Sequence, residues 1–329
     1  MPRTRCPGHL GSVETVVKTR LDLDRIHAAR RVIDPMFLDT PLYQCDALGR
    51  RLGCTVSVKL ETANPVRSFK ARGTELVASQ PGLSAVVCAS AGNLGQALAW
   101  SGGRRGLDVT VVASRHAPVA KLERIRALGA KLELVDGDIE TARARAANIA
   151  QQRGIRLLED SLDLETCEGA ATIGLELAGK AFDTVLIALG GGAMATGVGY
   201  VLKTLSPGVE VICVQPVGAP AMTRSWHERR VVTTESTDTI ADGVAGRHPI
   251  PEVLDDLLTV ADDAVLVRES SITDGMRLLL EQAGLVVEPS AALGVAAMLE
   301  DRDRFAGRHV VTVICGGNVD LEAYRRWVR

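Results

Sequence analysis

The chain has 329 residues, which is enough for one large globular unit or two modest domains. Its formal charge is -2 and it has no long block of like charges, so neither nucleic acid nor an anionic membrane is expected as a partner. Hydrophobic residues make up 46% of the chain and aromatic residues only 3%, so the core must be aliphatic.

Two features predict a cytoplasmic protein. No apolar run reaches the roughly 20 residues of a membrane span, and residues 1–13 lack the apolar core of a signal peptide. The seven cysteines include no C-x-x-C pair and have no histidine at metal-binding spacing. We therefore expect free thiols in a reducing compartment, and no metal site.

Short runs rich in Val, Ile and Leu alternate with longer helical patterns. Continuous apolar runs indicate strands buried on both faces, so we expect an α/β protein whose mostly parallel sheets are covered by helices. Helical spacing marks residues 118–128 and 139–152. The units form two groups, and a cleft between two α/β lobes is a natural cofactor site. The predicted strands are residues 56–60, 85–89, 109–113, 132–135, 184–189, 211–214 and 310–314.

The first predicted strand leads into an Asn64-Pro65 turn and then into the segment Ser68-Phe69-Lys70-Ala71-Arg72-Gly73. We expect Ser68 to cap a helix whose first turn contains Lys70. The positive end of a helix dipole favours the neutral amine that Schiff-base chemistry needs. Taken alone, however, a lysine in the first turn of a helix is more often an ordinary surface residue.

The segment around Lys70 resembles the Schiff-base motif of the fold-type II pyridoxal 5'-phosphate (PLP) enzymes, which include threonine and serine dehydratases, serine racemase, cysteine synthase and threonine synthase. Four motifs occur in the family's order along the chain. The resemblance implies a two-domain, tryptophan synthase β-like fold with PLP on Lys70 and Phe69 beside it. The small domain would be residues 83–159, the large domain residues 1–82 with 160–329, and the active site would lie in the cleft between them.

The strand at residues 85–89 runs into Ser90-Ala91-Gly92-Asn93-Leu94-Gly95-Gln96, and backbone N–H groups at such a turn can bind an anion. By resemblance, Ser90, Ala91, Gly92 and Asn93 bind the substrate carboxylate, and Asn93 also lies beside the ring hydroxyl of the cofactor. Two residues depart from the family. Ala91 replaces the serine that supplies a proton in serine racemase, which disfavours racemisation, and Leu94 replaces a histidine common in the dehydratases.

The strand at residues 184–189 is followed by Gly190-Gly191-Gly192-Ala193-Met194, and consecutive glycines before a helix form a nest of N–H donors. By resemblance this loop binds the PLP phosphate. Ala193 replaces the family's last glycine, and N–H donation survives unless the position needs a positive φ. The loop also fits the dinucleotide pattern G-x-G-x-x-A. The next strand ends in Gln215 instead of an acid, which makes a nicotinamide cofactor the weaker interpretation.

The last predicted strand ends in Cys315-Gly316-Gly317-Asn318, which resembles the S-G-G-N of dehydratases, whose serine meets the pyridine nitrogen. Cys315 would take that place, and as a weak donor it would leave the ring largely unprotonated. A buried cysteine at a strand end is the alternative. Gly243 resembles part of a loop that approaches the cofactor, and Glu288-Pro289-Ser290 resembles a serine racemase motif. Some relatives bind a divalent cation near the position of Gln215, which lacks the charge for it.

The resemblance implies a PLP-dependent ammonia-lyase that removes water from a small hydroxy amino acid, such as L-threonine or L-serine, and yields a 2-oxo acid and ammonia. Released Lys70 would be the base for the Cα proton. A PLP-dependent β-replacement synthase, or a lyase of a specialised pathway, is the closest alternative. A non-catalytic PLP-binding protein and a nicotinamide-dependent oxidoreductase are further ones. The family is mostly dimeric or tetrameric, so we expect a homodimer or homotetramer.

Overall fold

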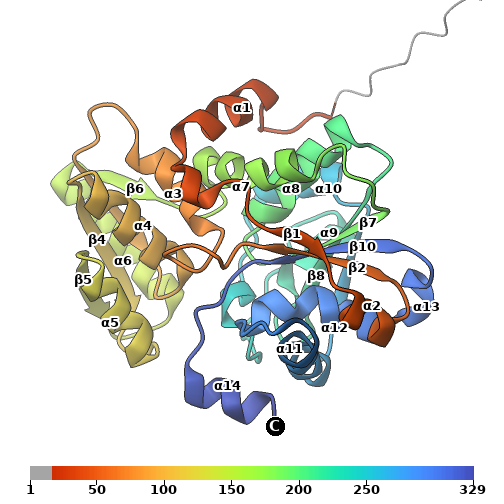
Figure 1. The fold of residues 1–329 in the computed structure, drawn as a ribbon. Coiled ribbons are helices and arrows are strands. Elements are labelled where there is room, and N and C mark those ends of the chain that lie inside the picture. The colour runs from red at the N-terminus through yellow and green to blue at the C-terminus, as the bar shows by residue number, and fades with distance from the viewer. Residues whose placement is uncertain (1–16) are drawn as a thin grey trace, which may run out of the picture.

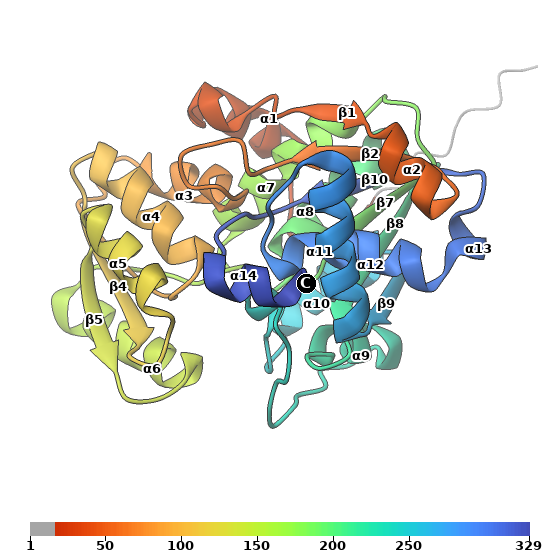
Figure 2. The ribbon, with the colours of Figure 1, turned by 60° about the horizontal axis from the view of Figure 1, so that its bottom comes forward.

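Two β-sheets, each flanked by helices, organise the molecule. The computed structural model describes residues 17–329. In Figure 1 the smaller sheet lies in the left-hand lobe and the larger sheet in the right-hand lobe, and Figure 2 shows the same separation from a second direction. No helix in the described part of the chain combines the length and apolar character needed to cross a membrane.

The larger sheet has six strands. The edge strand that comes first in the sequence is antiparallel to its neighbour, and all the other neighbouring pairs are parallel. In the parallel pair formed by its second and third strands in spatial order, Val310 lies opposite Val56 and Ile314 opposite Leu60, so both strands end at the same level. The loops that follow the parallel strands therefore emerge along one edge of the sheet. In spatial order the strands are β1 (Leu42–Gln44), β2 (Thr55–Leu60), β10 (His309–Ile314), β7 (Thr184–Ala188), β8 (Glu210–Pro216) and β9 (Asp263–Val267).

The smaller sheet has four strands, and all its neighbouring pairs are parallel. Its order places the last strand in the sequence beside the first, so the loops after these two strands are neighbours. In spatial order the strands are β5 (Lys131–Val135), β4 (Asp108–Ser114), β3 (Ala85–Ala89) and β6 (Arg156–Leu158).

Helices cover both faces of each sheet, which buries the apolar strands on both sides. On the larger sheet, α7, α8 and α10 lie on one side and α2, α11 and α12 on the other (Figure 1). On the smaller sheet, α4 and α5 pack against one face and α6 against the other. The helices are α1 (Leu23–Val32), α2 (Asp46–Leu52), α3 (Lys70–Ala78), α4 (Asn93–Arg104), α5 (Val119–Ala127), α6 (Ile139–Arg153), α7 (Leu164–Leu177), α8 (Ala193–Leu205), α9 (Ala221–Glu228), α10 (Pro251–Val260), α11 (Glu269–Ala283), α12 (Leu293–Glu300), α13 (Arg302–Phe305) and α14 (Leu321–Trp327), with 3-10 turns η1 (Pro35–Phe37), η2 (Asp242–Val244) and η3 (Pro289–Ala292).

The predicted α/β class, all seven predicted strands and both predicted helices are confirmed, and no end differs from its predicted position by more than two residues. Three strands were not predicted. β1 and β6 are only three residues long and lack a continuous apolar run, because both lie at sheet edges. β9, also at an edge, has the sequence Asp-Ala-Val-Leu-Val, and its apolar run would have justified a prediction.

Candidate active site

Lys70 is the first residue of α3, so its side chain leaves the helix at the amino-terminal end. The predicted cap is wrong, because Ser68 Oγ is buried without a hydrogen-bond partner and Phe69 occupies the cap position. Main-chain pairing with the end of β10 fixes the segment instead. Ser68 forms an antiparallel bridge with Gly316, and Phe69 N–H donates to the Cys315 carbonyl at 3.1 Å. The lysine and the cysteine loop are therefore held together by the main chain.

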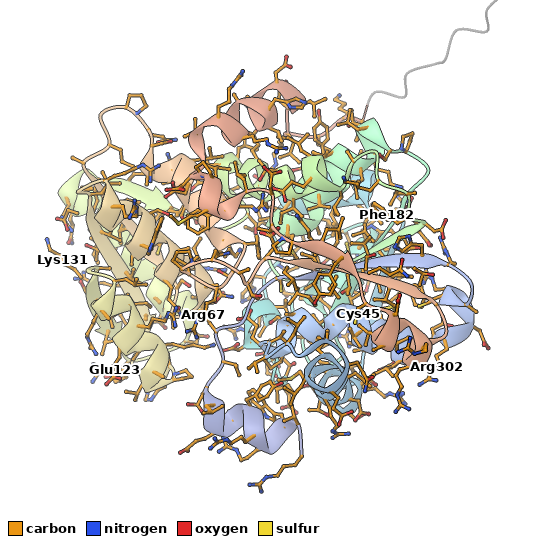
Figure 3. All side chains as sticks on the ribbon, in the orientation of Figure 1. Cys45, Arg67, Glu123, Lys131, Phe182 and Arg302 are labelled. Carbon is orange, nitrogen blue, oxygen red and sulfur yellow. The ribbon has the colours of Figure 1, made fainter. Side chains whose placement is uncertain are left out.

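Arg67, labelled in Figure 3, precedes this segment where the two lobes meet. Its φ is 53°, in the left-handed region that favours glycine. Its carbonyl accepts a hydrogen bond from Gly317 N–H at 2.9 Å, which adds a further contact with the loop after β10. Such a backbone conformation persists only where the surrounding structure fixes it.

Arg72 anchors α3 two residues after the lysine. Its side chain is fully buried and forms ion pairs with Glu61 (Nε to Oε2, 2.8 Å) and Glu176 (Nη1 to Oε1, 2.6 Å). Burial alone would lower the pKa of Arg72, but the two carboxylates raise it above its ordinary value. Lys59 forms a further ion pair with Glu176. Because Glu61 follows β2 and Glu176 lies in α7, this cluster fixes the direction in which α3 starts.

Two glycines allow α3 and α7 to approach closely. A Cβ atom on Gly73 would lie 2.7 Å from Thr166 Cα, and one on Gly169 would lie 2.4 Å from Gly73 N. Both distances are too short for side chains other than hydrogen. The glycine after Arg72 is thus explained by helix packing.

The Nζ atom of Lys70 contacts a residue that the sequence analysis did not single out. Oδ1 and Oδ2 of Asp160 lie 2.8 Å and 2.6 Å from it. Asp160 follows β6, and the sheet order places β6 beside β3, whose own loop carries the predicted substrate-binding residues. The acidic pair Glu159-Asp160 after a strand would have been a signal, but β6 itself was not predicted.

The loop from Ser90 to Asn93 joins the end of β3 to the start of α4. Ser90 Oγ accepts a hydrogen bond from Gly92 N–H at 3.1 Å, which fixes the turn. Asn93 is the first residue of α4, so N–H groups without helical partners surround this loop. Leu94 is buried and lines the same cavity as Ala91.

Asn93 also belongs to a polar cluster around Glu288. Its Nδ2 donates to Glu288 Oε1 at 2.8 Å, and its Oδ1 accepts from Asn318 Nδ2 at 2.9 Å. The main-chain N–H of Asn318 donates to Glu288 Oε2 at 3.2 Å. Burial raises the pKa of Glu288 to about 7, although the hydrogen bond from Asn93 acts in the opposite direction. The cluster therefore links the loop after β3 to the loop after β10.

The glycine loop lies between β7 and α8. Gly192 has a φ of 112°, and a Cβ atom there would lie 2.4 Å from Val253 Cγ1. A Cβ atom on Gly191 would lie 2.6 Å from Ser161 Oγ. These two glycines are therefore required for the backbone to approach its neighbours, and the loop presents main-chain N–H groups at the start of a helix.

Ala193, which replaces the family's last glycine, is the first residue of α8 and is absent from the residues with positive φ in the described chain. The substitution by alanine therefore costs no backbone strain. Its N–H donates to Ser161 Oγ at 3.1 Å, in the loop that also carries Asp160. Ser161 lies in none of the motifs that predicted the site.

Cys315 directly follows β10 and is buried. Burial is the main cause that raises the pKa of its thiol above the ordinary value, and the carboxylate of Glu288 raises it further, while Lys70 lowers it. The thiol is therefore neutral at physiological pH. It can offer a cofactor only a weak hydrogen bond and no negative charge.

One cavity of about 390 Å³ brings together every residue that the sequence analysis predicted for the site. Asp160, Lys121, Asp242, Glu288 and Ser290 also line it. Asp242 forms an ion pair with Lys121, and Oγ of Ser290 is buried without a partner. The roles of the predicted residues stay predictions. Those residues are Phe69, Lys70, Ser90, Ala91, Gly92, Asn93, Gly190, Gly191, Gly192, Ala193, Met194, Gly243 and Cys315.

Comparison with known proteins identifies the class of this site. A model of the family described as pyridoxal-phosphate dependent enzyme matches residues 33–316, so the chain belongs to that family. An L-threonine ammonia-lyase of Thermotoga maritima is 32% identical over 312 residues, which are 93% of this chain and 78% of that protein.

Solved structures show the same relationship. The processed form of threonine deaminase isoform 2 from Solanum lycopersicum has a TM-score of 0.85 at 28% identity, over 93% of each of the two chains. A maize serine racemase also has a TM-score of 0.85, at 27% identity, over 93% of this chain and 96% of that one. The chain is thus a fold-type II PLP enzyme similar to threonine ammonia-lyases and serine racemases.

The cofactor is PLP, and the cavity fits it. Gly191 and Gly192 line the cavity without side chains, at the amino-terminal end of α8 where a phosphate is favoured. Lys70 supplies an amine within the same cavity, which Cys315 also lines.

Proposed function

We propose that this protein is a PLP-dependent lyase that eliminates water from L-threonine or L-serine and releases a 2-oxo acid and ammonia. The observation that carries the proposal is the convergence of Lys70, the Ser90–Asn93 loop, the glycine loop and Cys315 on one cavity. The similarity to threonine ammonia-lyases over most of the chain supports the same reaction. Serine dehydratase activity belongs to the proposal because serine differs from threonine by only one methyl group.

Each group has a role in this proposal. Lys70 would hold the cofactor as a Schiff base, and its free amine would take the Cα proton. The main-chain N–H groups from Gly190 to Met194 would hold the phosphate, and Gly243 and Phe69 would line the site of the cofactor. Bound PLP supplies the electron sink for the negative charge that develops at Cα. Cys315 would lie near the pyridine nitrogen, and its neutral thiol would leave the ring a weak electron sink, which suits rapid loss of a β leaving group.

The loop from Ser90 to Asn93 receives the substrate carboxylate through its N–H groups. Ala91 carries no proton-donating group, so inversion at Cα is disfavoured relative to elimination. The alternative reaction, β-replacement, would need a second substrate that acts as a nucleophile. A product assay with and without an added thiol distinguishes β-replacement from elimination.

An absorbance titration tests the proposal. Purified protein supplied with PLP should show the visible band of a lysine Schiff base, and Lys70→Ala should lack it. L-threonine or L-serine should change the band and yield a 2-oxo acid, and Lys70→Ala should be slower by at least about 10³-fold. A wild-type protein without such a band would overturn the cofactor role of Lys70. A band without a 2-oxo acid from either amino acid would overturn the reaction alone.

The same proposal includes a small domain of residues 83–159, a large domain of residues 1–82 and 160–329, a homodimeric or homotetrameric state and a cytoplasmic location. The smaller sheet, all of whose strands lie between residues 85 and 158, supports the division into domains. The free thiols of the six cysteines in the described residues support a reducing compartment. Analytical ultracentrifugation of the purified protein tests the oligomeric state.

A further inference from the structure

Asp160 is a charged residue of the cavity for which the proposed function gives no role. It lies in the loop between β6 and α7, and both oxygens of its carboxylate contact Nζ of Lys70 at 2.6–2.8 Å. The side chains of Lys70 and Asp160 are 16% and 30% exposed, so solvent reaches the pair. Asp160 therefore touches the atom that must bond to the cofactor.

The chemistry of that bond creates a requirement. A lysine side chain is an ammonium ion at neutral pH, and an ammonium nitrogen has no lone pair with which to attack an aldehyde carbon. A proton must leave Nζ before PLP can be captured. The same is true at the end of a turnover, after Lys70 has taken the Cα proton and must bond to the cofactor again.

Among the described residues, no other acidic group of the cavity is placed to take this proton. Asp242 is occupied by its ion pair with Lys121. Glu288 accepts hydrogen bonds from Asn93 and Asn318, and none from Lys70 is present in the described part of the chain. The Cys315 thiol is protonated because burial raises its pKa. Asp160 is the carboxylate in contact with Nζ.

We propose that Asp160 is a catalytic residue that accepts a proton from the Lys70 ammonium and so frees the amine to bond to PLP. This rests on the proposed role of Lys70 as the cofactor-binding lysine. The proposal extends to the return of Lys70 to the cofactor after each turnover.

The step balances in atoms and charge. An N–H bond of Lys70 breaks and an O–H bond of Asp160 forms. The freed lone pair forms a C–N bond with the aldehyde carbon of PLP, and the aldehyde oxygen leaves as water. That water carries two of the three ammonium protons, one of them through Asp160, and the third stays on nitrogen. Asp160 ends as a carboxylate and is ready for the next transfer.

The test measures cofactor capture instead of turnover. Cofactor-free wild-type protein and Asp160→Asn are mixed with PLP, and the growth of the Schiff-base band is followed by stopped-flow absorbance. Asparagine keeps the size and polarity of the side chain but does not accept a proton from an ammonium ion. Capture by Asp160→Asn should be slower by about 10²-fold.

Two controls separate proton transfer from a structural role. Deoxypyridoxine 5'-phosphate has a methyl group in place of the aldehyde, so its affinity should be the same in wild type and Asp160→Asn. Asp163→Asn removes a second carboxylate from the same loop. The carboxylate of Asp163 forms its ion pair with Arg156, at 3.9 Å, and not with Lys70, so this variant should capture PLP at the wild-type rate.

The outcomes are distinct. If Asp160→Asn captures PLP at the wild-type rate, the inference is overturned. It is also overturned if the variant loses PLP capture and affinity for deoxypyridoxine 5'-phosphate to the same extent, because this indicates a distorted cavity. Slow capture with unchanged analogue affinity supports it. A wild-type protein that forms no Schiff-base band with PLP would contradict the proposed function itself.

Discussion

Two ion clusters stand two residues apart on α3 and differ in solvent access. The side chains of Arg72, Glu61 and Glu176 are 0%, 1% and 4% exposed, and the Arg72 guanidinium has acceptors on all three nitrogens. Lys70 and Asp160 form a single pair that opens to a cavity. A closed cluster can only position the helix, whereas an open pair can exchange its proton and its partner. On this helix, solvent access and the number of hydrogen-bond partners distinguish the structural cluster from the reactive pair, more than the identity of the charges does.

The largest expected effect tests the closed cluster. Arg72→Met leaves the Glu61 and Glu176 carboxylates buried without their main cation, and it should lower the free energy of unfolding by about 3–5 kcal/mol. Urea unfolding of the cofactor-free protein measures this. Arg126→Met, an exposed arginine on α5, should change the same quantity by no more than about 0.5 kcal/mol. Similar values for the two variants would mean that the cluster does not anchor α3.

Glu288 is an intermediate case, since it is buried like Arg72 but lies at the cavity. Burial raises its pKa to about 7 in the folded protein, above its ordinary value in the unfolded chain. Between these two values the folded state holds a proton that the unfolded state has lost. The contribution of this group to stability is therefore present at low pH and is lost as the pH rises towards about 7, at no more than about 1.4 kcal/mol per pH unit.

Glu288→Gln should remove that loss. The cofactor-free variant should gain stability relative to wild type at pH 8, and the gain should shrink towards pH 5. Urea unfolding at both values measures the difference, and Glu123→Gln, an exposed position labelled in Figure 3, is the matched control. An equal effect at pH 5 and pH 8 would show that Glu288 does not change its protonation between them.

The same contrast explains how far the sequence could predict the site. Lys70, the glycine loop and Cys315 each lie in a local motif, and the order of these motifs along the chain allowed them to be predicted together as one site. Asp160 reaches the cavity, and Ser161 reaches the glycine loop, only because β6 pairs with β3, and a strand of three residues with an arginine at its start gives no such signal. The error at Ser68 has a similar origin. A local capping rule was applied to a segment whose conformation is set by pairing with Gly316, far away in the sequence.

The smallest expected effect tests the open pair. Lys70→Met keeps the length of the side chain but removes its charge, which leaves Asp160 without a cation at 2.6 Å. Because both side chains are partly exposed, water can solvate the carboxylate, and the pair should contribute no more than about 0.5–1 kcal/mol to stability. Urea unfolding of the cofactor-free variant should thus give a midpoint near that of wild type, far from that of Arg72→Met. A loss of several kcal/mol would instead mean that the pair stabilises the fold. Asp160 would then be a structural partner of Lys70. Its assignment as a proton acceptor would no longer be supported, because that assignment depends on a pair that solvent can reach and that can exchange its proton.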